Sequence, residues 1–124
     1  MNYLVVAPPP YNEHSPRIST TTVTEEVLRR WPDAEITMDA SGPFALRWWA
    51  LNKHFEGKHF RDGHGVSIGG PFDAVLDFAI WVRRAIGRDV VFADVGYSGS
   101  VEVTASMTAN ELEAAYRADV EDDG

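Results

Sequence analysis

Residues 69–88 read GGPFDAVLDFAIWVRRAIGR and carry the strongest helix signals in the chain. Gly70 stands where an N-cap residue belongs, Pro71 has the fixed φ angle of a first helical residue, and Gly87 suits a left-handed C-cap. Apolar residues recur at three- and four-residue spacing in two adjacent stripes, which leaves only a narrow polar side. We therefore expect a largely buried helix that lies across a β-sheet and is covered elsewhere by another helix or by loops.

The composition limits the classes of protein to which this chain can belong. Its 124 residues fit one domain, large enough to form a core without a metal ion or a disulfide. It has no cysteine, which excludes disulfides, thiolate nucleophiles and cysteine-bound zinc. No apolar run reaches the roughly 18 residues that a membrane helix needs, and the first residues lack the basic start of a secretion signal. We expect a soluble, cytoplasmic protein.

The net charge favours one kind of partner over others. Nineteen acidic residues against eleven Lys and Arg give a formal charge of -8. This charge disfavours nucleic acid and anionic lipid, because both carry negative phosphates, and it favours a basic protein. A negative surface that only keeps the protein soluble explains the same composition.

The segments before residue 69 alternate between strand and helix patterns. Tyr3–Ala7 is an apolar run typical of a buried strand, and a proline loop follows over residues 8–16. Thr22 and Glu25 have the spacing of a capping box, and the helix that they open ends before Pro32. Further strands are expected at 35–40 and 44–51, and turn signals at Glu56-Gly57 and Asp62-Gly63 predict an antiparallel meander over 44–68.

The segments after residue 88 complete the fold prediction. Strands are expected at 90–93 and 101–104, and the capping box of Thr108 and Glu111 opens a last helix. Together the elements predict a single α+β domain over residues 1–120, followed by a frayed acidic tail at 121–124. We expect a mostly antiparallel or mixed sheet with about three helices packed largely on one face.

Histidines offer the only metal-ligand pattern in the sequence. His54, His59 and His64 are spaced by five residues, and histidine is a common ligand for zinc. An interval of five places successive residues on opposite faces of a strand, so a metal site is the weaker alternative to solvated polar residues. The glycines before residue 71 match neither the Rossmann nor the P-loop spacing, and we expect no cofactor.

Aromatic and acidic residues suggest a surface for binding another protein. Trp48 and Trp49 are adjacent, so on a strand they point to opposite faces, and we expect Trp49 to be an exposed anchor. Asp94, Tyr97 and Glu102 place an aromatic residue between two carboxylates, a pattern suited to a basic cleft. The alternative is that Tyr97 folds back onto the sheet and the acids are merely solvated.

The stretch GYSGSVEV at residues 96–103 lies close to the helix of residues 69–88 in sequence. In this stretch, its size and its acidity, the chain resembles small immunity proteins of bacterial polymorphic and contact-dependent toxin systems, mainly over residues 72–112. The resemblance implies a protein that covers the basic active-site cleft of a toxin, often a nuclease. We expect a monomer or homodimer that binds such a partner through Trp49, Asp94, Tyr97 and Glu102 and that is not itself an enzyme.

Two other classes of function remain open from the sequence. The first is a small-molecule-binding domain or small enzyme whose pocket lies between the sheet and residues 11–19, with His14 or the later histidines as acid or base. The second is a structural subunit whose exposed aromatic residues form a homodimer interface. A melting temperature that rises with added ligand would favour the first class. Sedimentation would reveal the dimer that the second class requires.

Overall fold

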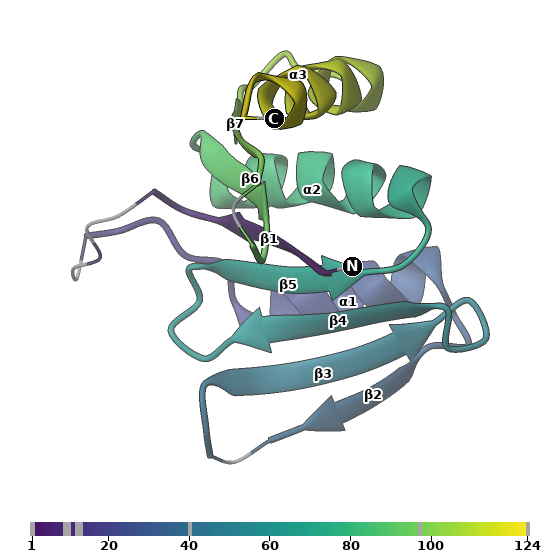
Figure 1. Cartoon of the computed structure of the whole chain (residues 1–124). Coiled ribbons are helices and arrows are strands. Elements are labelled where there is room, and N and C mark those ends of the chain that lie inside the picture. Colours follow the sequence, from purple (N-terminus) through teal and green to yellow (C-terminus); the bar gives the residue numbers. More distant parts are fainter. Residues whose placement is uncertain (1, 9–10, 12–13, 40, 97, 124) are drawn as a thin grey trace.

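The fold is an antiparallel sheet with helices packed on one face (Figure 1). This computed structural model describes residues 2–8, 11, 14–39, 41–96 and 98–123. The elements, in chain order, are β1 (Asn2–Val6), α1 (Thr20–Arg30), β2 (Glu35–Met38), β3 (Phe44–Ala50), β4 (Phe55–Phe60), β5 (Gly65–Gly69), α2 (Phe72–Ile86), β6 (Val90–Asp94), β7 (Ser100–Val103) and α3 (Ala109–Asp123). None of the described helices is long and apolar enough to cross a membrane.

The seven strands have the order β2-β3-β4-β5-β1-β6-β7, and every neighbouring pair is antiparallel. The α+β class predicted from the sequence is therefore confirmed. β3 to β5 form the meander expected over residues 44–68, and β2 pairs with β3 at its edge, whereas β1 lies inside the sheet between β5 and β6. β1 is paired along both of its edges, with β5 on one side and β6 on the other.

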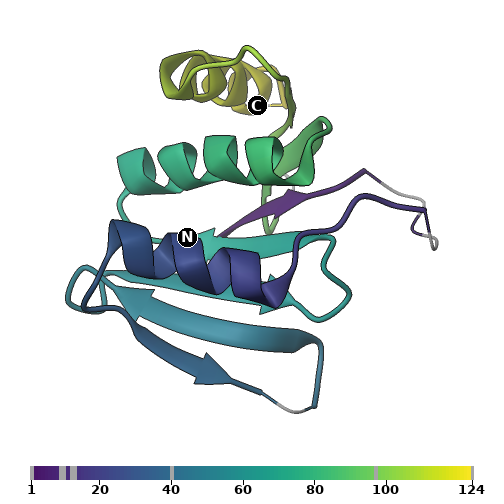
Figure 2. The same cartoon turned by 180° about the vertical axis from the view of Figure 1, so that it is seen from behind.

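The three helices cover the same face of the sheet (Figure 2). α1 packs against β3, α2 lies across β5, β1 and β6, and α3 packs on β7 and on α2. Phe78 of α2 is at the centre of the core, where its ring is within about 6 Å of the rings of Trp31, Trp48, Phe55 and Trp81. The amphipathic pattern of residues 69–88 thus identified the helix around which the core is built.

The helix ends differ in part from the predictions. Gly87 has φ +80° and closes α2 as expected, but α2 begins at Phe72 and Pro71 occupies the cap position. α1 begins before the predicted capping box, because the Ser19 hydroxyl accepts a hydrogen bond from the Thr22 backbone N–H. The box of Thr108 and Glu111 is present and closes both of its hydrogen bonds at 3.2 Å.

Two further boundaries correct the sequence analysis. Residues 121–123 continue α3, so this part of the expected frayed tail is helical, and Gly124 lies outside the described residues. Glu56 and Gly57 form no turn and lie within β4. A side chain at Gly57 would overlap the indole of Trp48, so this glycine provides space for packing rather than a reversal of the chain.

Candidate functional site

A cavity of about 570 Å³ opens at one end of the sheet. Residues 30–35, which join α1 to β2, form one wall, and residues 49–53, which join β3 to β4, form the other. The antiparallel pairing of Glu35 with Trp49 brings the two segments together. This cavity differs from the pocket predicted from the sequence, which was expected between the sheet and residues 11–19.

The turn that forms one wall of the cavity has an unusual backbone. Leu51, Asn52 and Lys53 are consecutive and have φ angles of 53°, 54° and 70°. Residues with a side chain enter this left-handed region at a cost of roughly 1–2 kcal/mol each, and asparagine is the only one of the three that does so readily. The turn is closed by a hydrogen bond of 3.0 Å from the His54 backbone N–H to the Leu51 carbonyl. Such strain is typical of segments that position a binding site.

Replacing Lys53 with glycine is expected to stabilise the protein by about 1 kcal/mol, because glycine adopts a positive φ without steric cost. Urea unfolding of the two proteins measures the change. Lys53→Ala is the matched control, since it removes the same ammonium group but keeps the backbone strain. Equal midpoints for the glycine and alanine variants would show that the turn is not strained.

Most of the charged side chains around the cavity have no ion-paired or hydrogen-bonded partner among the described residues. Arg30 and Lys53 are the cations and Asp33 and Glu35 are the anions. Among the described residues, none of the four forms an ion pair with another of the four. Of the four, Arg30 alone has a hydrogen-bonded partner within the described part of the chain, which is Glu26.

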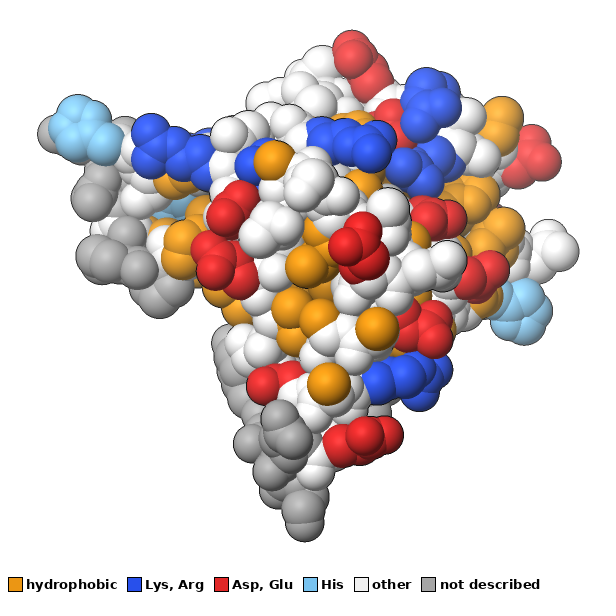
Figure 3. All heavy atoms as spheres, turned by 90° about the horizontal axis from the view of Figure 1, so that it is seen from above, with side chains coloured by type: hydrophobic (Ala, Val, Ile, Leu, Met, Phe, Trp, Pro, Cys, Tyr) orange, Lys and Arg blue, Asp and Glu red, His pale blue; other side chains and the backbone are white. Residues whose placement is uncertain are grey.

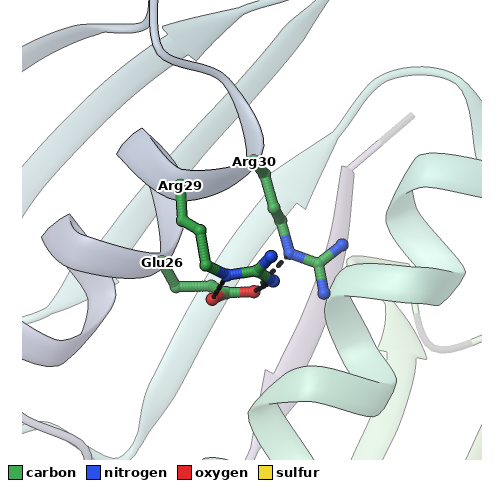
Figure 4. Close-up of polar contacts among 3 residues, drawn as sticks. All are labelled: Glu26, Arg29 and Arg30. Atoms are coloured by element: carbon green, nitrogen blue, oxygen red, sulfur yellow. Dashed lines mark hydrogen bonds and ion pairs between the residues drawn. The ribbon is translucent and has the colours of Figure 1, made fainter.

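Glu26 fixes the position of Arg30 (Figure 4). It is 7% exposed and accepts a hydrogen bond of 2.6 Å from Arg30 Nε and a bidentate pair of 2.7 and 2.6 Å from Arg29. Hydrogen bonding from Arg29 lowers the pKa of the Glu26 carboxyl, and Arg30 adds to this effect while burial opposes it. Glu26 therefore binds both arginines. The two terminal nitrogens of Arg30 point away from Glu26, toward α2.

The face of the sheet opposite the helices carries Trp49. Its neighbour Trp48 is fully buried against the helices, so the two indoles do lie on opposite faces. Trp49 is half-buried and pairs with Glu35 on β2 and Glu56 on β4, which places one carboxylate on either side of the indole. Directly paired residues have Cβ atoms about 5 Å apart, close enough for all three side chains to contact one group.

A row of basic residues lies beside this acidic row. Arg47 and Lys58 are paired on β3 and β4, and both approach the ring of Phe44, at 5.8 and 5.3 Å from its centroid. Lys58 is also 3.8 Å from Glu56. The aromatic ring and the nearby carboxylate offset the repulsion between two cations that face each other across strands.

Asp94 does not lie on a binding surface, which corrects the prediction made for it. It is 2% exposed and accepts hydrogen bonds from the Ser98 and Gly99 backbone N–H groups, the Ser98 hydroxyl and the Tyr116 hydroxyl. Burial raises the pKa of this carboxyl, but these hydrogen bonds outweigh burial and hold the pKa far below its usual range. Burial and the hydrogen bond to Asp94 raise the pKa of Tyr116 to about 12. Asp94 is therefore a structural residue that ties the β6–β7 turn to α3.

The other residues predicted to contact a partner are dispersed. Tyr97 lies outside the described residues. Glu102 is exposed on the same open face as Trp49, but four strands lie between them, which corresponds to about 24 Å along the sheet. The structure therefore does not join Glu102 to Trp49 in one small site. It provides Glu35 and Glu56 as the carboxylates next to the tryptophan.

The three histidines of the metal hypothesis do not form one cluster. His54 is exposed in the turn before β4, whereas His59 and His64 are buried around the opposite end of that strand. The described residues contain no group of three His, Asp or Glu side chains that could hold a metal ion. His14 is exposed in the loop that precedes α1. The arrangement gives no support to the weak metal alternative.

His59 and His64 are instead core residues beneath the loop that precedes α1. Burial lowers the pKa of His59, and its Nδ1 lies 3.4 Å from the Thr20 hydroxyl. The ring of Tyr11 stacks on His64 with centroids 4.1 Å apart, and Arg17 Nε donates to His64 Nε2 at 3.4 Å.

Seen from the α3 end, the described acidic and basic side chains are interspersed, with hydrophobic side chains between them (Figure 3). The described side chains visible at this end therefore form no continuous acidic surface for a basic partner. Comparisons with family models, curated proteins and solved structures find no match for this chain. Its function must be inferred from the chemistry of its own residues.

Proposed function

We propose that this chain is a small acidic protein-binding module of the immunity type, which covers the basic active-site cleft of a toxin. The observation that supports it best is Trp49 on the open sheet face, flanked by Glu35 and Glu56. The proposed setting is the bacterial cytoplasm, and no catalytic step is assigned to the chain.

The geometry around Trp49 suits a guanidinium or ammonium group of a partner. The face of an indole attracts a cation by about 0.5–2 kcal/mol, depending on how far water is excluded. Carboxylates on both sides add charge-assisted hydrogen bonds, which are stronger than neutral ones. A half-buried tryptophan at the centre of such a patch is also the residue type that most often dominates binding energy.

The net charge of -8 acts over a longer range than these contacts. A negative protein attracts a basic partner before contact, which raises the association rate and makes that rate fall with salt. Binding through the Trp49 patch would therefore weaken at high ionic strength. The residues at Asp94 and Tyr97 are not part of this proposal.

Affinity capture from a lysate of the source cells tests the proposal, with captured proteins identified by mass spectrometry at low and high salt. We expect one basic protein, weakened by salt and lost with the double variant Glu35→Lys and Glu56→Lys. The matched control is Glu25→Lys with Glu121→Lys, which changes the net charge equally at exposed positions on α1 and α3. Capture of no basic protein, or equal capture by both double variants, would contradict the proposal.

A further inference from the structure

Two buried histidines lie beneath the segment that leads into α1. His59 is 1% exposed and His64 is 5% exposed, and residues 17–20 contact both of them. We infer that residues 14–19 form a strap that is closed at neutral pH and opens in mild acid, when His59 takes up a proton. This inference does not rest on the protein-binding role proposed above.

The strap is attached to the end of β4 and to the turn that follows it. The Ile18 backbone N–H donates to the Gly63 carbonyl at 2.8 Å, and the Ile18 side chain is buried. Thr20, the first residue of α1, lies next to the strap, and its hydroxyl is 3.4 Å from His59 Nδ1. These contacts all fall on residues 59–64, so a change at His59 acts where the strap is attached.

The surroundings of His59 suit a neutral imidazole. An imidazolium carries an N–H on both ring nitrogens, and Nε2 is buried with no hydrogen-bond partner among the described residues. Nδ1 lies beside the first turn of α1, where the helix dipole places partial positive charge. Burial lowers the pKa of His59, and the Ile18 carbonyl and the Asp62 carboxylate oppose this effect only in part.

The groups that face His59 offer little compensation for a positive charge. The charged or titratable ones are Asp62, His64 and Arg17, and Asp62 is 3.4 Å from His64 Nδ1 with its own side chain 56% exposed, so water screens its charge. The neighbours on α1, β3 and β5 are uncharged: Thr20, Leu46 and Val66. The imidazolium is therefore accommodated best when the strap moves away and water reaches the ring.

The direction of the pH effect follows from the two states of the strap. When the strap is open, His59 meets water and has the usual histidine pKa of about 6.5, whereas its pKa in the closed state is lower. The closed state is therefore fully favoured above about pH 6.5 and loses stability as the pH falls below this value. At about pH 5 the opening equilibrium rises by up to about 30-fold, the limit for a ring that stays neutral while the strap is closed.

Amide hydrogen exchange of the full chain tests the inference, with the Ile18 N–H as the reporter of opening. Each measured rate is divided into the rate of an unprotected amide at the same pH. We expect the protection of Ile18 to fall at least about 5-fold from about pH 7.5 to about pH 5. The Trp31 N–H, which donates to the Val27 carbonyl at the other end of α1, should change by less than about 2-fold. An equal fall at both amides would indicate global unfolding and overturn the inference.

His59→Gln separates the proton on His59 from other effects of acid. This variant keeps a polar side chain but cannot be protonated, so the protection of Ile18 should be the same at both pH values. His54→Gln is the matched control, because His54 is exposed in the turn before β4 and the fall should persist. Constant protection of Ile18 in the wild type, or an undiminished fall in His59→Gln, would contradict the role of His59.

A second measurement needs no variant and remains decisive if His59→Gln does not fold. The titration of the His59 ring in the wild type, followed by NMR, should have a midpoint below about pH 6.5 and should coincide with the loss of protection at Ile18. A midpoint at or above that value, or a ring that titrates while Ile18 stays protected, would overturn the inference. None of these results bears on the capture of a basic protein.

Discussion

Replacing Asp94 with alanine is expected to destabilise the fold by about 4 kcal/mol, because four donor groups lose their acceptor. These are the backbone N–H groups of Ser98 and Gly99 and the hydroxyls of Ser98 and Tyr116. A buried donor without an acceptor costs roughly 1–3 kcal/mol. The hydrogen bonds that are lost connect β6 to the turn before β7 and to α3. Unfolding in urea, followed by circular dichroism, measures the destabilisation.

The pH dependence of stability separates the contribution of the Asp94 charge from the contribution of its packing. The hydrogen bonds depress the pKa of the folded carboxyl, so its stabilising contribution is complete above the unfolded pKa of about 3.9 and is lost as the pH falls below it. The difference in free energy of unfolding between the wild type and Asp94→Ala should therefore become smaller below about pH 4. Asp89→Ala is the control, since this half-buried acid makes a single ion pair with Arg83 and should cost less than about 1 kcal/mol. Similar losses from the two variants would contradict the structural role of Asp94.

Replacing Gly57 with alanine is expected to destabilise the protein by about 3 kcal/mol, because the added methyl group would overlap the indole of Trp48. Trp48 cannot move aside easily, since it is fully buried against Phe78 of α2. The backbone of Gly57 needs no positive φ, so the effect isolates packing from backbone strain. Thermal and urea unfolding measure the loss.

Two controls test the reason for the effect of Gly57→Ala. Gly87→Ala introduces no overlap but places a side chain at φ +80°, so it should cost only about 1 kcal/mol. In a Trp48→Leu background, Gly57→Ala should cost at least about 1 kcal/mol less than in the wild type, because the smaller side chain leaves room for the methyl group. An unchanged cost in that background would mean that the indole is not the obstacle.

The sequence predicted those parts of the fold that depend on local signals. The stripes of α2, the left-handed Gly87 and the capping box of α3 are each contained in a short segment, and all three occur in the structure. The α+β class followed from the order of such segments. The position of β1 in the sheet could not be predicted from local signals, because its neighbours β5 and β6 lie far along the chain.

The candidate site was largely missed for the same reason. Trp49 was expected to be an exposed aromatic, but its acidic neighbours are set by strand register rather than by sequence position. In residues 94–102 an aromatic residue lies between two acids, which suggested a binding surface. The carboxylate of Asp94, however, accepts hydrogen bonds from the backbone of its own turn. The turn at residues 51–53 contains no glycine, and Asn52 was the only local sign of a left-handed backbone.

The interior position of β1 has a consequence for the order in which the protein folds. β1 is made before the other strands of the sheet, but it has no partner until β5 has been made, and its second edge is paired only after β6 has followed. At roughly 5–20 residues per second, synthesis from β1 to the end of β6 takes roughly 4–18 s. During that interval the β2–β5 meander can form from contacts between successive hairpins, which close quickly. The first strand of the sheet to be made is thus incorporated only after β2 to β5, and one of its edges stays unpaired until β6 follows.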